Sequence, residues 1–145
     1  MEFEIRQLER YTREAATANA ICRAALLTPR AHLGWYDDSQ VHGAFVGDSM
    51  VGVSEIYEDA QDRRRLYIAR LAVDPGSQGQ HVGTRLVDHA ASLAIRQGYD
   101  MLSTFPATER SEDFFVSRGF KWPPPPLKDI GTHMYRDLTI GDSEQ

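Results

Sequence analysis

In the first part of the chain, the spacing of the hydrophobic residues changes once. Phe3 and Ile5 alternate with charged residues over residues 2–8, which predicts a half-buried strand. From Glu9 the apolar positions recur at helical spacing, and Pro29 is expected to stop that helix. The stripe predicted to face the core comprises Tyr11, Ala15, Ala18, Cys22, Ala25 and Leu26.

The middle of the chain predicts a hairpin followed by a long buried strand. Two apolar runs, 41–46 and 50–57, flank residues 47–49, whose Gly-Asp-Ser sequence suits a tight antiparallel turn. After a polar loop, residues 66–73 form the most continuous apolar run, which is typical of a central strand covered on both faces. The sequence Asp-Pro-Gly at 74–76 ends this strand abruptly.

The remaining pattern predicts a second amphipathic helix, a strand and a shorter helix. Residues 82–97 repeat apolar side chains on one helical stripe, and Gly98 is placed to cap its end. The later segments are a buried strand at 101–105, a short helix at 109–118 closed by Gly119, a strand beginning at Phe120, a stiff proline connector at 123–126, a strand at 132–138 and a frayed polar tail at 141–145.

This order of elements indicates a mixed α/β fold with antiparallel pairs early and a strand-helix-strand unit in the middle. The chain has 145 residues, of which 41% are hydrophobic and 26% are charged. That size and composition fit one globular domain with its own core, so residues 1–145 are predicted to be a single domain.

Charge and cysteine content narrow the function classes. Sixteen basic and 21 acidic residues give a net charge of -5, which disfavours nucleic acid as a partner. The arginine run at 63–65 is interpreted as a solvated loop rather than an anion site. Cys22 is the only cysteine, so an internal disulfide and a multi-cysteine metal site are both excluded. Its place on an apolar stripe favours a core role over a nucleophilic one.

The amino terminus lacks the basic start and apolar stretch of a signal peptide, and no run approaches the ~18 apolar residues of a spanning helix. A cytoplasmic protein without a membrane partner is therefore expected.

The segment 71–84 carries the strongest chemical signal, because it joins a central strand to a helix through a glycine-bearing turn. Free backbone N–H groups and the dipole at a helix start can hold a phosphate without lysine or arginine. Gly79 and Gly83 allow a close approach of the backbone. Neither the P-loop pattern nor the three-glycine dinucleotide pattern is present.

With its neighbours, this segment resembles motif A of the GNAT superfamily, the acetyl-CoA-dependent N-acetyltransferases. The sequence Leu-Ala-Val-Asp-Pro at 71–75 matches the strand end, and Gln78 and Gly83 match the first and last positions of the loop signature. His81 stands where the family has its middle glycine. The loop would act through backbone N–H groups, which His81 still offers.

Residues 112–120 resemble the end of the family's motif B, an aromatic residue followed by three residues and Gly-Phe. Phe115 stands where many members carry the tyrosine that protonates the leaving thiolate, so that role is vacant or has moved. Tyr67, Tyr57 and Ser111 are the alternatives for such an acid. Thr108 stands where many members have an asparagine that contacts pantetheine.

The resemblance implies a mixed, mostly antiparallel sheet with a splayed pair of strands, flanked by about four helices. It also implies acetyl-CoA as co-substrate, no metal, and direct attack of an amine on the thioester. The main chain of Leu71 and Val73 would bind pantetheine, and the loop would bind the pyrophosphate. The implied cofactor-binding residues are Leu71, Ala72, Val73, Gln78, Gly79, Gln80, His81, Val82, Gly83, Thr84, Thr108 and Phe115.

Several side chains are candidates for removing the ammonium proton of the acceptor. Glu55 and Tyr67 are the two catalytic candidates, and His42 is a third possible base. The alternative for Glu55 is that its carboxylate is exposed to solvent on the strand and has no catalytic role. Tyr57, Tyr67 and His133 are candidates for lining the acceptor pocket, with core packing or surface exposure as the alternative.

Two functions from different classes remain open on the sequence. The first is an N-acetyltransferase that acts on a primary amine of a small molecule or a protein, and the net acidity mildly favours a cationic acceptor. The alternative is a catalytically silent acyl-CoA-binding or sensing module, which Phe115 and the lack of an obvious base support. The identity of the amine and the formation of a homodimer are not decided by the sequence.

Overall fold

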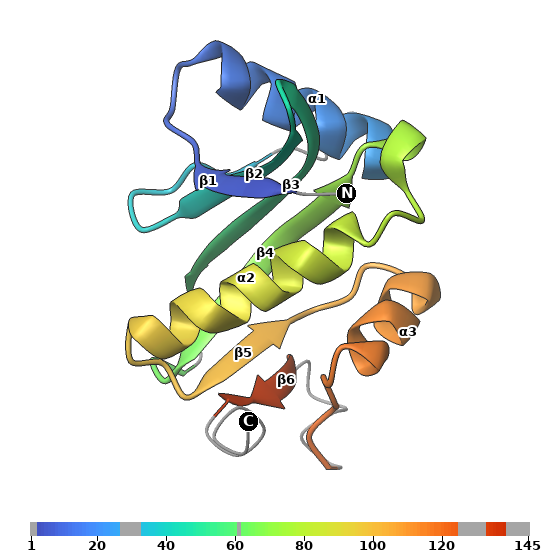
Figure 1. The fold of residues 1–145 in the computed structure, drawn as a ribbon. Coiled ribbons are helices and arrows are strands. Elements are labelled where there is room, and N and C mark those ends of the chain that lie inside the picture. The colour runs from blue at the N-terminus through green and yellow to red at the C-terminus, as the bar shows by residue number, and fades with distance from the viewer. Residues whose placement is uncertain (1–2, 27–32, 61, 125–132, 139–145) are drawn as a thin grey trace. The chain divides into compact units, whose positions relative to one another are not determined.

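The computed structural model describes residues 3–26, 33–60, 62–124 and 133–138. The described elements are β1 (Glu4–Gln7), α1 (Arg13–Leu26), β2 (Gln40–Val46), β3 (Ser49–Glu58), β4 (Arg65–Val73), a 3-10 turn (Pro75–Ser77), α2 (Val82–Arg96), β5 (Met101–Thr104), α3 (Glu109–Ser117) and β6 (Met134–Asp137) (Figure 1). The strands follow one another in the sheet in the order of the sequence.

The chain divides into two compact units. The first comprises Met1–Tyr57 and Ala69–His89, and the second comprises Glu58–Ile68 and Ala90–Gln145. Both β4 and α2 pass from one unit into the other, since each contains residues of both. In the described part of the chain, no helix is long and apolar enough to cross a membrane.

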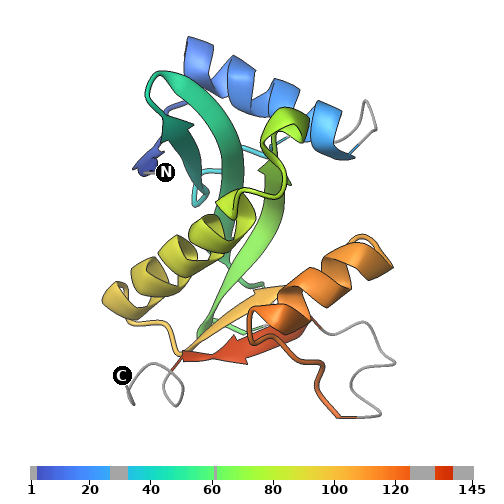
Figure 2. The same cartoon turned by 45° about the vertical axis from the view of Figure 1, so that its right-hand side comes forward.

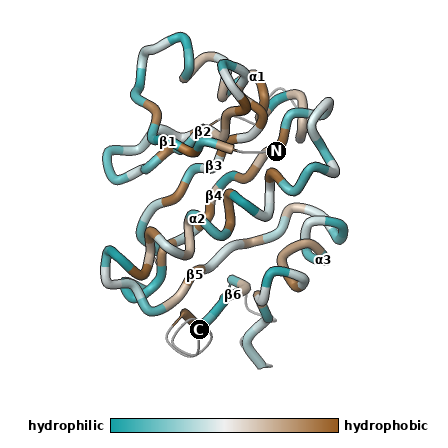
Figure 3. Tube along the Cα trace, in the orientation of Figure 1, coloured by the Kyte–Doolittle hydropathy of each residue, from teal (hydrophilic) through white to brown (hydrophobic). Residues whose placement is uncertain are grey.

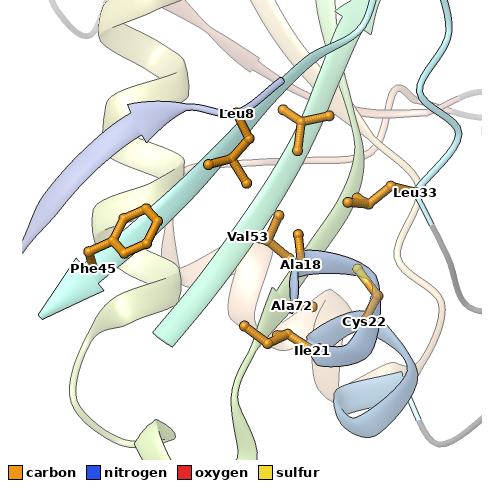
Figure 4. Close-up of a cluster of buried hydrophobic side chains, with 9 residues drawn as sticks. Leu8, Ala18, Ile21, Cys22, Leu33, Phe45, Val53 and Ala72 are labelled. Atoms are coloured by element: carbon orange, nitrogen blue, oxygen red, sulfur yellow. The ribbon is translucent and has the colours of Figure 1, made fainter. Parts of the chain in front are cut away.

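The first unit is built on an antiparallel meander covered by α1. β1 pairs with β2, and β2 pairs with β3, as the predicted hairpin requires. Ala18, Ile21 and Cys22 of α1 lie against Val53 and Ala72 in one apolar cluster (Figure 4). Cys22 is fully buried there, which confirms its predicted place in the core.

A second apolar cluster forms where the first half of α2 meets the sheet of this unit. Val82 and Leu86 of α2 are buried with Ala44 and Val51, and Leu71 and Val73 pack against the same cluster. The neighbouring Ala72 belongs instead to the cluster under α1. Side chains at the end of β4 therefore enter both apolar clusters, as predicted for a central strand. Figure 3 shows hydrophobic and hydrophilic segments alternating along α2, the pattern of an amphipathic helix.

The second unit contains the first half of β4, followed by β5, β6 and α3. β4 and β5 are parallel and pair from Arg65 with Met101 to Ile68 with Thr104. β6 is antiparallel to β5, with Met134 opposite Thr104. Figure 2 shows α3, in orange, beside the β5 and β6 pair. The buried face of α3 carries Phe115.

Most predicted boundaries are confirmed to within a few residues. Gly47, Gly98 and Gly119 all have positive φ, as expected for a hairpin turn and two helix ends. Three α-helices lie within the described residues, against about four expected. The tail at 141–145 lies outside the described residues, as does the second half of the proline connector at 123–126.

Two local predictions were wrong. Tyr11 does not lie on the apolar stripe of α1, because the Thr12 hydroxyl accepts a hydrogen bond from the Ala15 N–H (3.1 Å) and starts the helix after Tyr11. Tyr11 is accordingly 97% exposed. Phe120 does not begin a strand, since only Lys121 pairs there, in a single bridge with Tyr135. Pro123 and Pro124 follow and cannot donate ladder hydrogen bonds.

We predict that Gly52→Ala lowers the free energy of unfolding by about 1–3 kcal/mol, because a Cβ at Gly52 would overpack the α2 contact. That Cβ would lie 2.6 Å from Cγ1 of Val82 and 3.0 Å from Cδ1 of Leu86. Gly76→Ala is the matched control, since its Cβ would meet only Asp74 Oδ2, at 3.3 Å. Urea unfolding measures both variants. An equal stability of the two would contradict the close packing of β3 and α2.

Candidate active site

The segment between β4 and α2 folds as the predicted strand, sharp turn and helix start. Asp74 N–H donates to the Val51 carbonyl (2.9 Å) and fixes the end of β4 on β3. The 3-10 turn then closes with a hydrogen bond from Ser77 N–H to the Asp74 carbonyl (2.8 Å). Residues 78–81 follow and are exposed. The loop is thus anchored at its start and open to solvent before the helix.

The start of α2 has the features of an anion site. The first intrahelical hydrogen bond runs from Arg85 N–H to the His81 carbonyl (3.0 Å), so the amides of 82–84 precede the helix ladder. The first turn of α2 contains no acidic side chain, so the positive end of the helix dipole is not compensated there. The phosphate-binding role of residues 78–84 stays a prediction.

His81 has a left-handed backbone, with φ of 64°, and Gly79 has φ of 86°. A side chain with a Cβ rarely adopts this conformation, although histidine is among the residues that tolerate it best. The position at which the motif usually has glycine therefore keeps a glycine-like conformation.

β4 continues past its pairing with β5. The ladder between these strands ends at Ile68, and β4 runs on through Val73. Within the described residues, β5 therefore does not engage the main chain of Ala69–Val73. Leu71 and Val73 are half-buried and Ala72 is buried. The expected binding of pantetheine by the main chain of this stretch stays a prediction.

The two motif B residues have structural partners of their own. Thr108 is the N-cap of α3, and its hydroxyl accepts a hydrogen bond from Ser111 N–H (3.1 Å). The Ser111 hydroxyl accepts in return from Thr108 N–H (2.9 Å), which completes a capping box. Phe115 is buried and packs edge-on against Phe114 and Phe120, with ring centroids 5.3 and 5.2 Å away.

Glu55 is buried, with only 1% of its surface exposed, so it is not the solvated strand carboxylate that the pattern allowed. Its Oε1 accepts from Gly34 N–H (2.8 Å), and its Oε2 accepts from Trp35 N–H (2.7 Å) and the Ser39 hydroxyl (2.9 Å). Both oxygens are therefore engaged by the segment that leads into β2. This arrangement favours an anchoring role for Glu55 over that of a proton acceptor.

Tyr67 lies in β4 within a small polar and aromatic cluster of the second unit. Its ring stacks on His133, with centroids 4.5 Å apart and planes 23° from parallel. His133 Nδ1 lies 2.9 Å from Oδ2 of Asp59, and the Ser103 hydroxyl donates to the same oxygen (2.6 Å). Sequence reasoning named Tyr67 and His133 but missed Asp59. No local signal marks a buried carboxylate in a polar loop.

The other candidates for proton transfer, His42, Tyr57 and Ser111, each have contacts of their own. Burial lowers the pKa of His42 to about 4, with a smaller contribution from His89, whose ring centroid lies 4.8 Å away. His42 is therefore a weak base. Tyr57 packs edge-on against Tyr36 at 5.6 Å. The Ser111 hydroxyl is used in the capping box.

Cys22 is unsuited to nucleophilic attack. Its burial raises the pKa of the thiol to about 11, so almost no thiolate exists at neutral pH. Among the described residues, no group of three or more histidine, cysteine or acidic side chains could hold a metal ion.

The arginine run behaves as a solvated loop. Arg63 and Arg64 are exposed, and the Arg64 guanidinium pairs with Asp62 at 3.0 Å. The side-chain hydrogen bond from Arg64 is the main cause that lowers the pKa of Asp62 to about 2. Arg65, which is partly buried, also pairs with Asp62, at 3.5 Å. A neighbouring carboxylate thus engages two of the three guanidinium groups.

Comparison with known proteins links this geometry to one family. The sequence model of the acetyltransferase (GNAT) family matches residues 6–120. The PaiA N-acetyltransferase of Thermoplasma acidophilum, solved with coenzyme A, is 17% identical, with a TM-score of 0.73 over 94% of this chain and 99% of that chain. A search of curated proteins finds no match.

Two further solved structures share the fold. A Bacillus subtilis acetyltransferase in complex with CoA is 15% identical, with a TM-score of 0.72 over 94% of this chain and 99% of that chain. The ribosomal-protein-S18-alanine N-acetyltransferase of Escherichia coli is 16% identical, with a TM-score of 0.70 over 94% of each chain.

We predict opposite effects of two substitutions at His81. His81→Gly leaves the free energy of unfolding unchanged or raises it by up to about 1 kcal/mol, because relief of the left-handed strain offsets the entropy cost of glycine. His81→Val lowers it by about 1–2 kcal/mol, because a β-branched residue is strained at positive φ. Gln80→Val, at the exposed neighbouring position, is the control. Equal stability of the His81 variants in urea unfolding would show that the loop relaxes to another conformation.

Proposed function

Because this chain belongs to the acetyltransferase (GNAT) family, we propose that it transfers the acetyl group of acetyl-CoA to a primary amine. The amine attacks the thioester directly, and no acyl group is carried by the protein. The acceptor is an amine of a small molecule or of a protein, and the net charge of -5 favours a cationic one.

The start of α2 is the observation that carries this proposal. Amides 82–84 precede the helix ladder, the first helical turn lacks acidic residues, and the loop before it is exposed and left-handed at Gly79 and His81. The pyrophosphate of coenzyme A would be bound by these N–H groups and by the helix dipole. The stretch of β4 beyond the β5 ladder would bind pantetheine through the main chain of Leu71 and Val73.

In the proposed reaction, the neutral amine nitrogen bonds to the thioester carbon and the C–S bond then breaks. A backbone N–H near Leu71 would stabilise the oxyanion that develops on the thioester oxygen. Cys22 takes no part, because a buried thiol with a pKa of about 11 is a poor nucleophile. Phe115 has no proton to give, so coenzyme A leaves as a thiolate, which its reference pKa of about 8.5 permits.

The structures that share the fold support an amine acceptor without naming one for this chain. The Escherichia coli neighbour acts on the alanine of a ribosomal protein. Another neighbour, a soil-metagenome aminoglycoside acetyltransferase that is 18% identical with a TM-score of 0.67, was solved with sisomicin and covers 79% of this chain and 86% of that chain. Protein and small-molecule amines are therefore both included in the test below.

We predict that the native protein releases coenzyme A thiol from acetyl-CoA only when an amine is added. The amines tested are spermidine, lysine, sisomicin and a peptide with an amino-terminal alanine, and mass spectrometry identifies the acetylated product. Gly83→Asp abolishes acetyl-CoA binding and turnover, because it places a carboxylate beside the pyrophosphate. Gly47→Asp is the matched control, because it adds the same charge in the β2–β3 turn, where a Cβ would meet nothing within 4 Å. This variant is expected to keep both acetyl-CoA binding and turnover.

Two results would contradict this proposal in different ways. Tight calorimetric binding of acetyl-CoA without any acetylated amine would favour the catalytically silent acyl-CoA-binding module. Unchanged acetyl-CoA binding in folded Gly83→Asp protein would instead show that the start of α2 is not the binding site.

A further inference from the structure

Two histidines meet inside the first unit, where the first half of α2 packs on β2. The ring centroids of His42 and His89 lie 4.8 Å apart, and the ring planes are tilted by 59°. His42 is 4% exposed, and its Nδ1 is buried without a hydrogen-bond partner among the described residues. A titratable side chain is thus buried between a helix and a sheet, and the proposed function gives it no role.

This contact lies on the same face of α2 as the residues that hold the helix start. Val82 and Leu86 are buried in one apolar cluster with Ala44. Ala44 follows His42 by two positions in β2, so both side chains point to the face of the sheet that α2 covers. Residues three apart share one face of a helix, which places His89 next to Leu86 on the packed face of α2.

The sheet partners of His42 carry no charge. They are Gln7 of β1 and Ser54 of β3. Among the described residues, His89 is the ionisable group that acts on the pKa of His42. The charged side chains of this half of α2 are both exposed, those of Arg85 and Asp88. A proton on His42 therefore meets no compensating carboxylate among the partners that the structure describes.

The neutral ring of His42 is the form that fits this interface. An imidazolium carries hydrogen on both nitrogens, so Nδ1 would be a buried donor without an acceptor. Burial also removes the water that stabilises the charged ring. Burial, and to a smaller extent the charge of His89, lowers the pKa of His42 from its ordinary value of 6.5 to about 4.

The lowered pKa fixes the direction of the pH effect. An exposed imidazole takes up its proton as the pH falls through 6.5, whereas the packed ring takes it up only near pH 4. The packing therefore loses free energy as the pH falls from about 6.5 toward about 4, and it keeps its full strength above this window. From these two pKa values, opening of the interface is about 30-fold more favourable at pH 5 than at pH 7.5.

We propose that the His42–His89 contact makes the packing of α2 on the antiparallel meander sensitive to acid, so that protonation of His42 releases the first half of α2. The charged ring then gains water and separates from His89. Release also disrupts the helix start at 82–84, so mild acid favours a form that does not bind coenzyme A. This consequence for coenzyme A rests on the proposed function, whereas the acid-sensitive packing does not.

Carboxylates of the first unit also take up protons as the pH falls. Glu55 is buried there, and its oxygens accept hydrogen bonds from Gly34, Trp35 and Ser39. These donors belong to the segment before β2 and not to α2. A comparison with a variant that lacks only the His42 imidazole therefore separates the histidine effect from that of the carboxylates.

The test is amide hydrogen exchange of the native protein and of His42→Leu at pH 7.5 and pH 5, without ligand. Relative to the variant, we expect the protection factors of the α2 amides at 86–89 in the native protein to be about 30-fold lower at pH 5. Leucine has a similar volume and cannot be protonated, so His42→Leu lacks this decrease. His42→Gln, which keeps a polar side chain, lacks it as well.

His81→Asn is the matched control in the same unit. His81 is exposed, and asparagine is among the residues that tolerate its positive φ. This variant is expected to keep the native decrease in protection at 86–89. The α1 amides at 17–22 should keep their protection at pH 5 in all of these proteins, because the proposed release concerns α2 alone.

An NMR titration of the histidine rings in the native protein gives a readout that needs no variant. We expect the His42 ring to titrate near pH 4. Titration at about pH 6.5 would show that the packed ring is protonated as easily as an exposed one, and this would overturn the inference.

Two exchange results would also overturn it. An equal decrease in native and folded His42→Leu protein would assign the acid effect to other groups. An equal decrease at the α1 amides would show that acid unfolds the whole unit and does not release α2. None of these measurements contains coenzyme A. Failure of the native protein to bind coenzyme A would therefore overturn the proposed function and leave the acid-sensitive packing in place.

Discussion

The proposed binding site depends on one constraint, which is that the amides of 82–84 precede the hydrogen-bond ladder of α2 and therefore lack partners within the helix. A left-handed backbone at Gly79 and His81 turns the chain into the helix. Packing then fixes the helix start, because Val82 and Leu86 are buried against the sheet of the first unit. Gly52 lets them approach this closely, since a Cβ there would overlap Val82. This packing fixes the helix start at which we propose that an anion binds without lysine or arginine.

The fold was largely predictable because its signals are local. Period-two and helical apolar patterns located the strands and helices, and glycines at 47, 98 and 119 marked the turns and helix ends. The prediction failed where a single contact decided the boundary. The Thr12 hydroxyl caps α1, which begins at Arg13, two residues after Tyr11, and the prolines after Trp122 limit pairing with β6 to one bridge.

The polar side chains were the less predictable part of the site. From the sequence, Glu55 and Asp59 are expected to be exposed to solvent. Both are buried in the structure, and their hydrogen-bond partners come from segments that are distant in the sequence. The partners of Glu55 lie 16 to 21 residues away, and those of Asp59 lie 44 and 74 residues away. Only the fold brings such groups together. Motif resemblance predicted the cofactor loop but left the proton acceptor undecided for the same reason.

The central claim is that the start of α2 binds coenzyme A through its backbone. Titration of coenzyme A into ¹⁵N-labelled protein, followed through the backbone amide resonances, tests this claim directly. The account predicts that the largest shift changes occur at residues 78–84, with little change in the arginine loop at 63–65. Saturable binding with the largest changes at the arginine loop and none at 78–84 would contradict it.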